Sequence, residues 1–346
     1  SETSGDEVYL WEGGNSNLAN KQAQTQIGIS LTSDRYTAFY MERDTTDCIV
    51  VGGFINKREE IFEADNYSYS SNTGESLKYT TSTVISLNVN GEVKQLGVTF
   101  AHSTTSRVIK YDHAGGITLV EFSPVMGRRT CQSYGNKAFV FDDTYRDMEI
   151  YSFSSDGLVN YDRRANFFPA NEDRIVSVKY MQFAFIFPFQ SRNLEIVNME
   201  QISVVKTTNF FNSVKYRLCA FVSDSTAVVP HYGESGLDIV NLQNKTVIEK
   251  LNVFPSKIDV LSGFVFNGNV YMVCNGTRNL AVYEIQTGTG KILLNFFDVA
   301  ITSRVAVLNE KRNEVVIITN SNFIVTISLD NLIAQALPVR NNTETQ

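Results

Sequence analysis

The sequence has few of the residues that mark several protein classes. Its 346 residues include four Cys, three His, six Pro and a single Trp. Four Cys in a chain of this length do not make a disulfide framework. The three His residues are His102, His113 and His231, and no two of them have the spacing of a zinc site. Disulfide scaffolds and sequence-local zinc modules are therefore excluded, and the sequence predicts no metal ligand.

Long apolar runs and a large positive charge are also missing. The longest uninterrupted apolar segment runs from Phe183 to Phe189, whereas a membrane-spanning helix needs about 20 residues. A net charge of −7 argues against a protein that binds the nucleic-acid phosphate backbone. With 43% apolar and 12% aromatic residues, the chain is too hydrophobic to be disordered. We expect a folded, soluble protein with no membrane span and no nucleic-acid partner.

The sequence repeats itself with a fixed period of 43 residues. The segment Leu194 to Asn198 (LEIVN) recurs as Leu237 to Asn241 (LDIVN), and the same step leads to Leu280 and Phe323. A second marker keeps this period: Asn-Phe-Phe or Asn-Val-Phe begins at Asn166, Asn209, Asn252 and Asn295. Self-similarity at such a period indicates a repeat architecture.

Each repeat has the pattern of four short strands. In the repeat from Ser262, apolar strands at 263–266 and 270–274 flank the hairpin signal Asn267-Gly268, and two more strands follow at 280–285 and 292–296. Four antiparallel strands in 40 to 50 residues are the blade of a β-propeller. We therefore predict an all-β fold, a seven-bladed β-propeller of four-stranded antiparallel blades.

The whole chain, 1–346, is predicted to be one propeller domain. The expected blades are 26–63, 80–122, 129–168, 174–211, 213–254, 262–297 and 303–339. The polar segment 65–78 is expected to be a loop insertion. A short strand at 8–11 is a candidate to pair with the last blade and close the ring, above all if 330–337 is helical. Aromatic residues that end successive blades are expected to fill the space between them: Phe62, Phe122, Phe168, Phe211, Phe254 and Phe297.

On this repeat period and strand pattern, the chain resembles seven-bladed β-propellers of the WD40-like and quinoprotein-like kind. The Gly-His and Trp-Asp dipeptides of WD40 repeats do not recur. The nearest match to a quinoprotein repeat runs from Tyr283 to Lys291 (YEIQTGTGK), occurs once and lacks the Trp. The resemblance implies a fold and, by itself, no function.

Recognisable catalytic motifs are missing from the sequence. It has no Gly-x-Ser-x-Gly elbow, no phosphate-binding loop and no calcium-binding loop of the EF-hand type. The four Cys map to expected strands, where a thiol acts as a small apolar residue. We therefore expect no cofactor, although a calcium ion held by carboxylates in the channel stays open.

The loops between second and third strands share one rim of a propeller, and this rim is the candidate binding surface. Several of these loops contain or end in arginine, which suits bidentate contacts with carboxylate or phosphate groups. Local salt bridges are the alternative. Aromatic side chains on the same rim would suit a protein interface. The candidate binding residues are Arg43, Arg107, Arg146, Arg192, Arg278, Tyr145, Tyr232 and His231.

Glycosylation sequons stand at Asn66, Asn244, Asn275 and Asn341, all in expected loops or the tail. The first residue is Ser1 rather than Met, which fits a cleaved signal peptide or a trimmed chain. The sequence thus favours a secreted glycoprotein, with a cytoplasmic location as the alternative.

The function predicted from the sequence is a non-catalytic scaffold that binds another protein through its loops. A propeller enzyme of hydrolase or lyase type, with a carboxylate or metal site at the channel mouth, is the first alternative. A carbohydrate-binding lectin is the second. The sequence does not indicate a small-molecule ligand.

Overall fold

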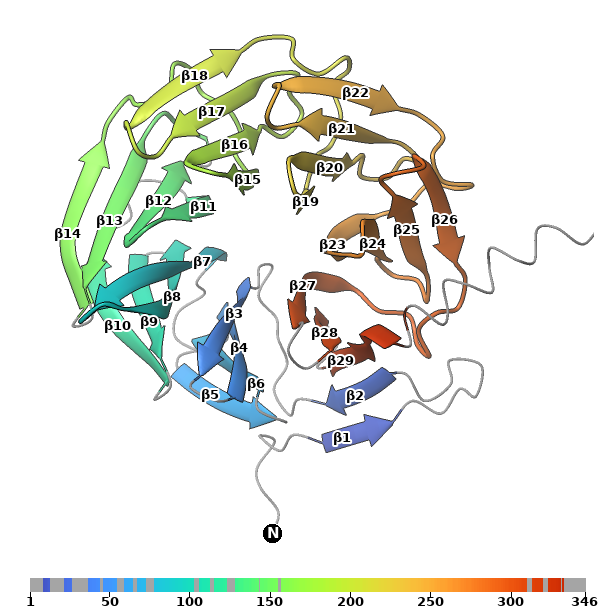
Figure 1. Ribbon diagram of the computed structural model, residues 1–346, viewed down its shortest axis with the longest axis horizontal. Helices are drawn as coiled ribbons and strands as arrows, with labels where there is room; N and C mark the ends of the chain where they lie inside the picture. Colours follow the sequence, from blue (N-terminus) through green and yellow to red (C-terminus); the bar gives the residue numbers. More distant parts are fainter. Residues whose placement is uncertain are drawn as a thin grey trace, which may run out of the picture. The chain divides into compact units, whose positions relative to one another are not determined.

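The computed structural model confirms an all-β chain, in which the described regular structure outside strands is a helical turn at residues 329, 330 and 332 (Figure 1). The described residues are 9–12, 22–26, 37–43, 46–54, 59–64, 67–72, 78–102, 106–112, 115–122, 128–142, 144–154, 157–309, 313–319, 323–330 and 332. The chain divides into two compact units. The central unit holds Ser33–Tyr232 and Gly236–Lys250, and the C-terminal unit holds Ser1–Thr32, Gly233–Ser235 and Leu251–Gln346.

Five sheets are regular blades, each with four consecutive strands in antiparallel order. The first has β7 (Lys78–Val89), β8 (Glu92–His102), β9 (Ser106–Asp112) and β10 (Gly115–Phe122). The second has β11 (Arg128–Tyr134), β12 (Lys137–Asp142), β13 (Met148–Ser154) and β14 (Gly157–Arg164). The third has β15 (Val176–Tyr180), β16 (Phe183–Phe187), β17 (Leu194–Asn198) and β18 (Ser203–Thr207). The fourth has β19 (Phe221–Ser223), β20 (Thr226–Pro230), β21 (Leu237–Asn241) and β22 (Thr246–Lys250). The fifth has β23 (Val260–Phe266), β24 (Asn269–Cys274), β25 (Leu280–Glu284) and β26 (Thr289–Leu293).

Two further sheets depart from this pattern. One contains β3 (Thr37–Arg43), β4 (Thr46–Phe54), β5 (Glu59–Ala64) and β6 (Tyr67–Asn72) in the order β3-β4-β6-β5, with β4 and β6 parallel. The other has five strands in the order β1-β2-β29-β28-β27. They are β1 (Tyr9–Glu12), β2 (Gln22–Gln26), β27 (Ser303–Asn309), β28 (Glu314–Thr319) and β29 (Phe323–Ser328).

The prediction of seven four-stranded antiparallel blades is therefore wrong in number, because five sheets have that form. The segment 65–78 is not simply a loop, since it contains β6, which inserts between β4 and β5. Its alternation of Tyr and Ser from Tyr67 is a period-two strand pattern that its polarity concealed. This strand also extends the first expected blade, 26–63, to a sheet that ends at Asn72.

The last sheet takes its outer strands from the N-terminus. After β29 the chain turns into the short helical segment instead of a fourth strand. Strand β2 pairs with β29, and β1 pairs with β2. The expected strand at 8–11 thus lies in the last sheet, but β2 is the strand that contacts β29 directly.

Tight turns follow from local sequence. Asn90-Gly91 and Asn267-Gly268 join first and second strands, and all four residues have positive φ, as a type I′ hairpin requires. The predicted hairpin at Asn267 is therefore confirmed. Such turns are short enough to keep neighbouring strands in register, so that the side-chain period of two sorts buried from exposed residues.

In the central unit, second and third strands carry the core. Strands β16 and β17 are buried along most of their length, whereas the fourth strand β18 alternates exposed and half-buried residues. The apolar clusters join residues of successive blades, for example Phe187 and Phe211 with Val229. Each blade thus buries its faces against its neighbours, as expected for repeats that cannot bury a core alone.

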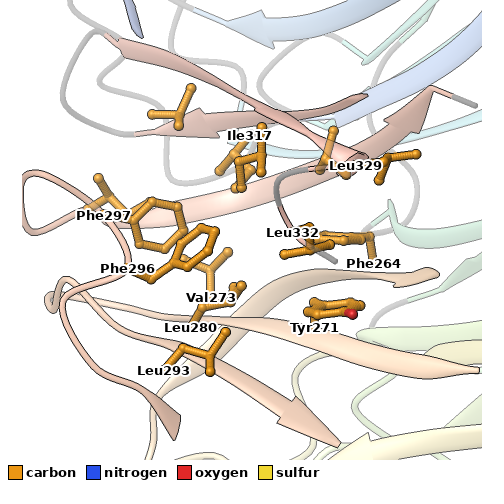
Figure 2. Close-up of a cluster of buried hydrophobic side chains, with 14 residues drawn as sticks. Phe264, Tyr271, Val273, Leu280, Leu293, Phe296, Phe297, Ile317, Leu329 and Leu332 are labelled. Atoms are coloured by element: carbon orange, nitrogen blue, oxygen red, sulfur yellow. The ribbon is translucent and has the colours of Figure 1, made fainter. Parts of the chain in front are cut away.

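The C-terminal unit has its own core, which Figure 2 shows. Phe296 and Phe297, which follow β26, pack with side chains of β25 and β28 such as Leu280 and Ile317. Leu332, in the helical turn, is fully buried in the same cluster. The blade-ending aromatic Phe297 therefore fills the space between two sheets, as predicted.

First strands of successive sheets are also bridged by small polar groups. Within the central unit, the Thr81 hydroxyl donates to Cys131 Sγ over 3.3 Å, and Gln132 Nε2 donates to Ser177 Oγ over 2.9 Å. Within the C-terminal unit, the Ser262 hydroxyl donates to Ser303 Oγ over 2.9 Å. These hydrogen bonds satisfy polar groups that packing has removed from water.

Candidate functional site

In four of the described blades, the segment that ends the blade is hydrogen-bonded to the loop between its second and third strands. Four Asn residues that start these segments have a left-handed backbone with φ near +54°, which Asn tolerates better than most residues. The Phe two positions later is at most 3% exposed in each case. The eight residues are Asn166, Asn209, Asn252, Asn295, Phe168, Phe211, Phe254 and Phe297.

Three predicted rim arginines hold these segments. Nε of Arg146 donates to the carbonyl oxygen of Phe168 over 2.7 Å. Arg192 makes the same bond to Phe211 over 2.8 Å, and Arg278 to Phe297 over 2.9 Å. In return, each Phe amide donates to the carbonyl oxygen of its arginine over 2.9 Å. These half-buried guanidinium groups thus act as supports for the loops that carry them.

The other predicted rim residues are placed differently. Arg43 is the last residue of β3 and Arg107 lies in β9, so neither stands in a loop, and their side chains lie outside the described residues. His231 follows β20 and is 1% exposed. Tyr145 is 62% exposed, and Tyr232 is partly exposed.

A fully buried arginine, Arg174, clamps the β11–β14 blade to the β15–β18 blade. Its Nε and Nη2 donate to the two carboxylate oxygens of Glu195 over 2.7 and 2.9 Å. Its remaining donors reach the carbonyl oxygens of Tyr145, in the preceding blade, and Ala170. The guanidinium carbon also lies 3.8 Å from the ring centroid of Phe168. Burial raises the pKa of Glu195, and the hydrogen bonds from Arg174 oppose that rise.

The next blade repeats this clamp. Arg217 Nε donates to Asp238 Oδ2 over 2.9 Å, and both side chains are fully buried. Nη1 donates to the carbonyl oxygen of Ser191 in the preceding blade over 2.8 Å, and Nη2 to that of Ser213 over 3.0 Å. The Arg217 guanidinium carbon is 3.7 Å from the Phe211 ring centroid. Arginine suits this role because its fixed fork serves several acceptors at once.

Sequence reasoning missed these clamps, although a signal for them exists. Arg174 and Glu195 are 21 residues apart, as are Arg217 and Asp238, and the two pairs are separated by the 43-residue period. One further period leads to Val260 and Ala281, a buried apolar pair. The repeat thus exchanges an ion pair for hydrophobic packing at equivalent positions.

Four aromatic residues lie in the loops that adjoin these clamps, and we call them the aromatic rim: Tyr145, Phe189, Tyr216 and Tyr232. The rings of Phe189 and Tyr216 stack with their centroids 5.2 Å apart. The Tyr232 amide donates to the Tyr216 carbonyl oxygen over 2.9 Å. The Phe189 amide donates to the carbonyl oxygen of Asp173, next to the arginine that holds Tyr145. One ring stack and several hydrogen bonds to the backbone therefore link these segments of three successive blades of the central unit.

The aromatic rim is partly open to water. Tyr145 is 62% and Tyr216 is 48% exposed, and Phe189 and Tyr232 are partly exposed. Sequence reasoning found Tyr145 and Tyr232 but missed the other two, because the stacking of Phe189 on Tyr216 joins residues from different blades. An open aromatic surface on a well-anchored backbone can bind apolar or aromatic side chains of a partner.

The described thiols are poor nucleophiles. Cys131 and Cys274 are buried and form no disulfide, and Cys219 forms no disulfide either. Burial raises the pKa of Cys131 to about 12 and that of Cys274 to about 11. Because the thiolate is the reactive form, both residues are expected to be inert at neutral pH.

A cavity of about 310 Å³ lies in the C-terminal unit beside the loop between β24 and β25. Its lining includes Lys257, Asp259, Asn275 and Cys274. The raised pKa of Cys274 makes this thiol unsuited to nucleophilic catalysis in the cavity.

Two of the predicted glycosylation residues fall within the described part of the chain. Asn244 is exposed in the turn between β21 and β22. Asn275 is half-buried, and its side-chain oxygen accepts a hydrogen bond from the Ser303 amide over 3.0 Å. Asn66 and Asn341 lie outside the described residues. Glycosylation and secretion stay predictions.

In the described part of the chain, no helix is long and apolar enough to cross a bilayer.

No protein-family model matches the sequence, and no curated protein is significantly similar to it. Solved structures do resemble the fold. A structure described as YCF48 bound to D1 peptide superposes with a TM-score of 0.58 at 9% identity, covering 86% of this chain and 97% of the other. YCF48 from Cyanidioschyzon merolae gives a TM-score of 0.51 at 8% identity, covering 68% and 80%. The Pan2 WD40 domain from Neurospora crassa gives a TM-score of 0.45 at 6% identity, covering 70% and 87%.

At these identities the first two similarities concern the fold alone. Together with the strand order, they identify the chain as an all-β propeller of four-stranded antiparallel blades.

Proposed function

We propose that this protein is a non-catalytic scaffold that binds a protein partner through the aromatic rim. The observation that carries the proposal is the ring stack of Phe189 and Tyr216 between two blades, together with the exposure of Tyr216 (48%) and Tyr145 (62%). Interface hot spots are enriched in tyrosine and other large side chains that pack without much loss of entropy. A similar fold, YCF48, has been solved with a peptide bound.

Rigidity of the supporting loops favours such a role. Arg146 and Arg192 hold the ends of the loops that carry Tyr145 and Phe189. Arg174 holds the Tyr145 carbonyl oxygen from below. A surface held in its binding conformation loses little entropy on association. The partner chemistry that fits is a peptide segment with apolar or aromatic side chains, which can stack on the Phe189–Tyr216 pair.

The test starts from linear peptides selected for binding from a phage-displayed random library. Affinities of the selected peptides for the wild-type chain, Tyr145→Ala and Tyr216→Ala are then measured by fluorescence anisotropy. We expect each substitution to weaken binding about tenfold or more, because truncation of a hot-spot residue costs about 2 kcal/mol.

Val205→Ala and Ile248→Ala are the matched controls. These residues are 64% and 61% exposed apolar side chains on the fourth strands β18 and β22. Peptides that lose affinity with these controls and keep it with the rim variants would contradict the proposal. Circular dichroism melts of every variant separate lost binding from lost folding.

A further inference from the structure

The β19–β22 blade places an acid opposite an acid. Asp238 of β21 is the cross-strand neighbour of Glu249 of β22. At the same register the preceding blades pair an acid with a base, Glu149 with Arg163 and Glu195 with Lys206. Like charges that face each other across strands are destabilising. The preceding blades carry the compensating base on their own fourth strands. The β19–β22 blade has an acid at that position and therefore requires a cation from elsewhere.

A histidine completes the group. His231, at the end of β20, is 1% exposed, and its Nε2 lies 2.9 Å from Asp238 Oδ2. One ligand atom each from His231, Asp238 and Glu249 lies within 4.8 Å of the other two. Asp238 and Glu249 lie on the adjacent strands β21 and β22, and His231 directly follows β20 of the same blade.

One oxygen of this group is buried without a hydrogen-bond partner. Asp238 is 0% exposed, and its Oδ2 accepts from Arg217 and contacts His231. Among the described residues, Asp238 Oδ1 has no hydrogen-bond partner. Glu249 is half-buried and accepts a hydrogen bond from the Ser213 hydroxyl. A buried carboxylate oxygen without a partner is costly and points to a missing ligand.

The charge balance gives the sign of that ligand. The group holds two carboxylates, Asp238 and Glu249, and Arg217 forms an ion pair with Asp238. Burial of an uncompensated charge is strongly unfavourable. The missing ligand is therefore a cation.

We propose that His231, Asp238 and Glu249 bind one divalent transition-metal ion of the zinc type. One imidazole nitrogen with two carboxylate oxygens is a donor set that zinc accepts, whereas calcium requires six to eight oxygens. Zinc bonds of about 2.0 to 2.2 Å place tetrahedral ligand atoms about 3.4 Å apart. The ligand atoms lie within 4.8 Å of one another, so metal binding requires them to approach by up to about 1.4 Å, and Glu249 is the half-buried member of the three.

Arg217 has a supporting role in this arrangement. Its bond to Asp238 Oδ2 orients the carboxylate and leaves Oδ1 for the metal. Because His231 and Asp238 are almost fully buried, the ion joins β20, β21 and β22 and takes no substrate. The site is structural.

The test uses the full chain after dialysis against EDTA. Isothermal titration with zinc chloride should show one site per chain in the wild type. Glu249→Gln and His231→Gln should each weaken binding at least tenfold, because each removes a ligand from the metal. Zinc should raise the melting temperature of the wild type and of neither variant, since a ligand that binds only the folded state stabilises it.

Glu200→Gln and His113→Gln are the matched controls, and both should bind zinc as the wild type does. Glu200 is exposed in the turn between β17 and β18. If His231→Gln fails to fold, the isosteric Glu249→Gln still decides. Wild type that binds zinc no more tightly than Glu249→Gln would overturn the proposal. A protonated His231 at neutral pH without zinc binding, seen by nitrogen-detected NMR, would also overturn it and make imidazolium the compensating cation.

Discussion

At the scale of residues, two blades carry fully buried ion pairs at equivalent positions, and these pairs affect the free energy of unfolding. Removal of one partner from such a pair costs about 3 to 5 kcal/mol, because the other charge stays buried, whereas an apolar replacement of both can be neutral. Val260 and Ala281 occupy the equivalent positions of the next blade, which shows that an apolar pair fits this place in the fold.

We therefore predict a non-additive pair of substitutions. Arg174→Val alone should lower the free energy of unfolding by about 3 kcal/mol, since Glu195 keeps its charge in a buried site. Adding Glu195→Ala should restore part of that loss. Urea unfolding of the two single variants, the double variant and the wild type measures the coupling. A double variant as unstable as the sum of the two single variants would contradict the ion-pair account.

Residue-scale features were only partly predictable from sequence. Three of the five rim arginines, Arg146, Arg192 and Arg278, were found by their loop positions. Their Nε bonds to the carbonyl oxygens of the blade-ending Phe residues depend on where the chain returns after the fourth strand. The Arg174 and Arg217 clamps could be recognised from sequence, because each arginine precedes its acidic partner by 21 residues. His231 was expected on the rim, yet it is buried, with its Nε2 2.9 Å from Asp238 Oδ2.

At the scale of elements, the pairing of β2 with β29 has a defined register. Ala23 lies opposite Thr326, and Gln24 lies opposite Val325. Directly opposite residues of an antiparallel pair project to the same face, while a shift of one residue puts them on opposite faces.

This register predicts which engineered disulfide forms. Ala23→Cys with Thr326→Cys should cross-link under mild oxidation, because directly opposite positions meet the distance needed for a disulfide. Ala23→Cys with Val325→Cys, shifted by one residue, should not. Mass spectrometry of the linked peptides identifies the bond among the native thiols. Equal cross-linking of both pairs, or cross-linking of the shifted pair alone, would contradict the pairing.

Element prediction succeeded where hydrophobic periodicity was strong. The strands of the β23–β26 blade follow the apolar segments and the Asn267-Gly268 turn. It failed at β6, because alternating Tyr and Ser residues give this segment little hydrophobic periodicity. Its strand character is evident only from its position between β4 and β5 in the sheet. Parallel pairing of β4 with β6 depends on a long-range contact that no local signal encodes.

At the scale of the molecule, the repeat period indicated the propeller, while the function depends on groups that only the folded chain brings together. Phe189 and Tyr216 stand 27 residues apart in different blades, and their stacking defines the middle of the aromatic rim. The acid-against-acid pair of Asp238 and Glu249 likewise emerges only from strand register.

The central claim is that a partner binds on the aromatic rim. Hydrogen–deuterium exchange of the wild-type chain, with and without a phage-selected peptide, tests it directly. The account predicts slower exchange in peptides that cover 144–147, 188–193 and 212–217, and unchanged exchange in β18 and β22. Protection confined to the fourth strands, or to the cavity beside the β24–β25 loop, would contradict it.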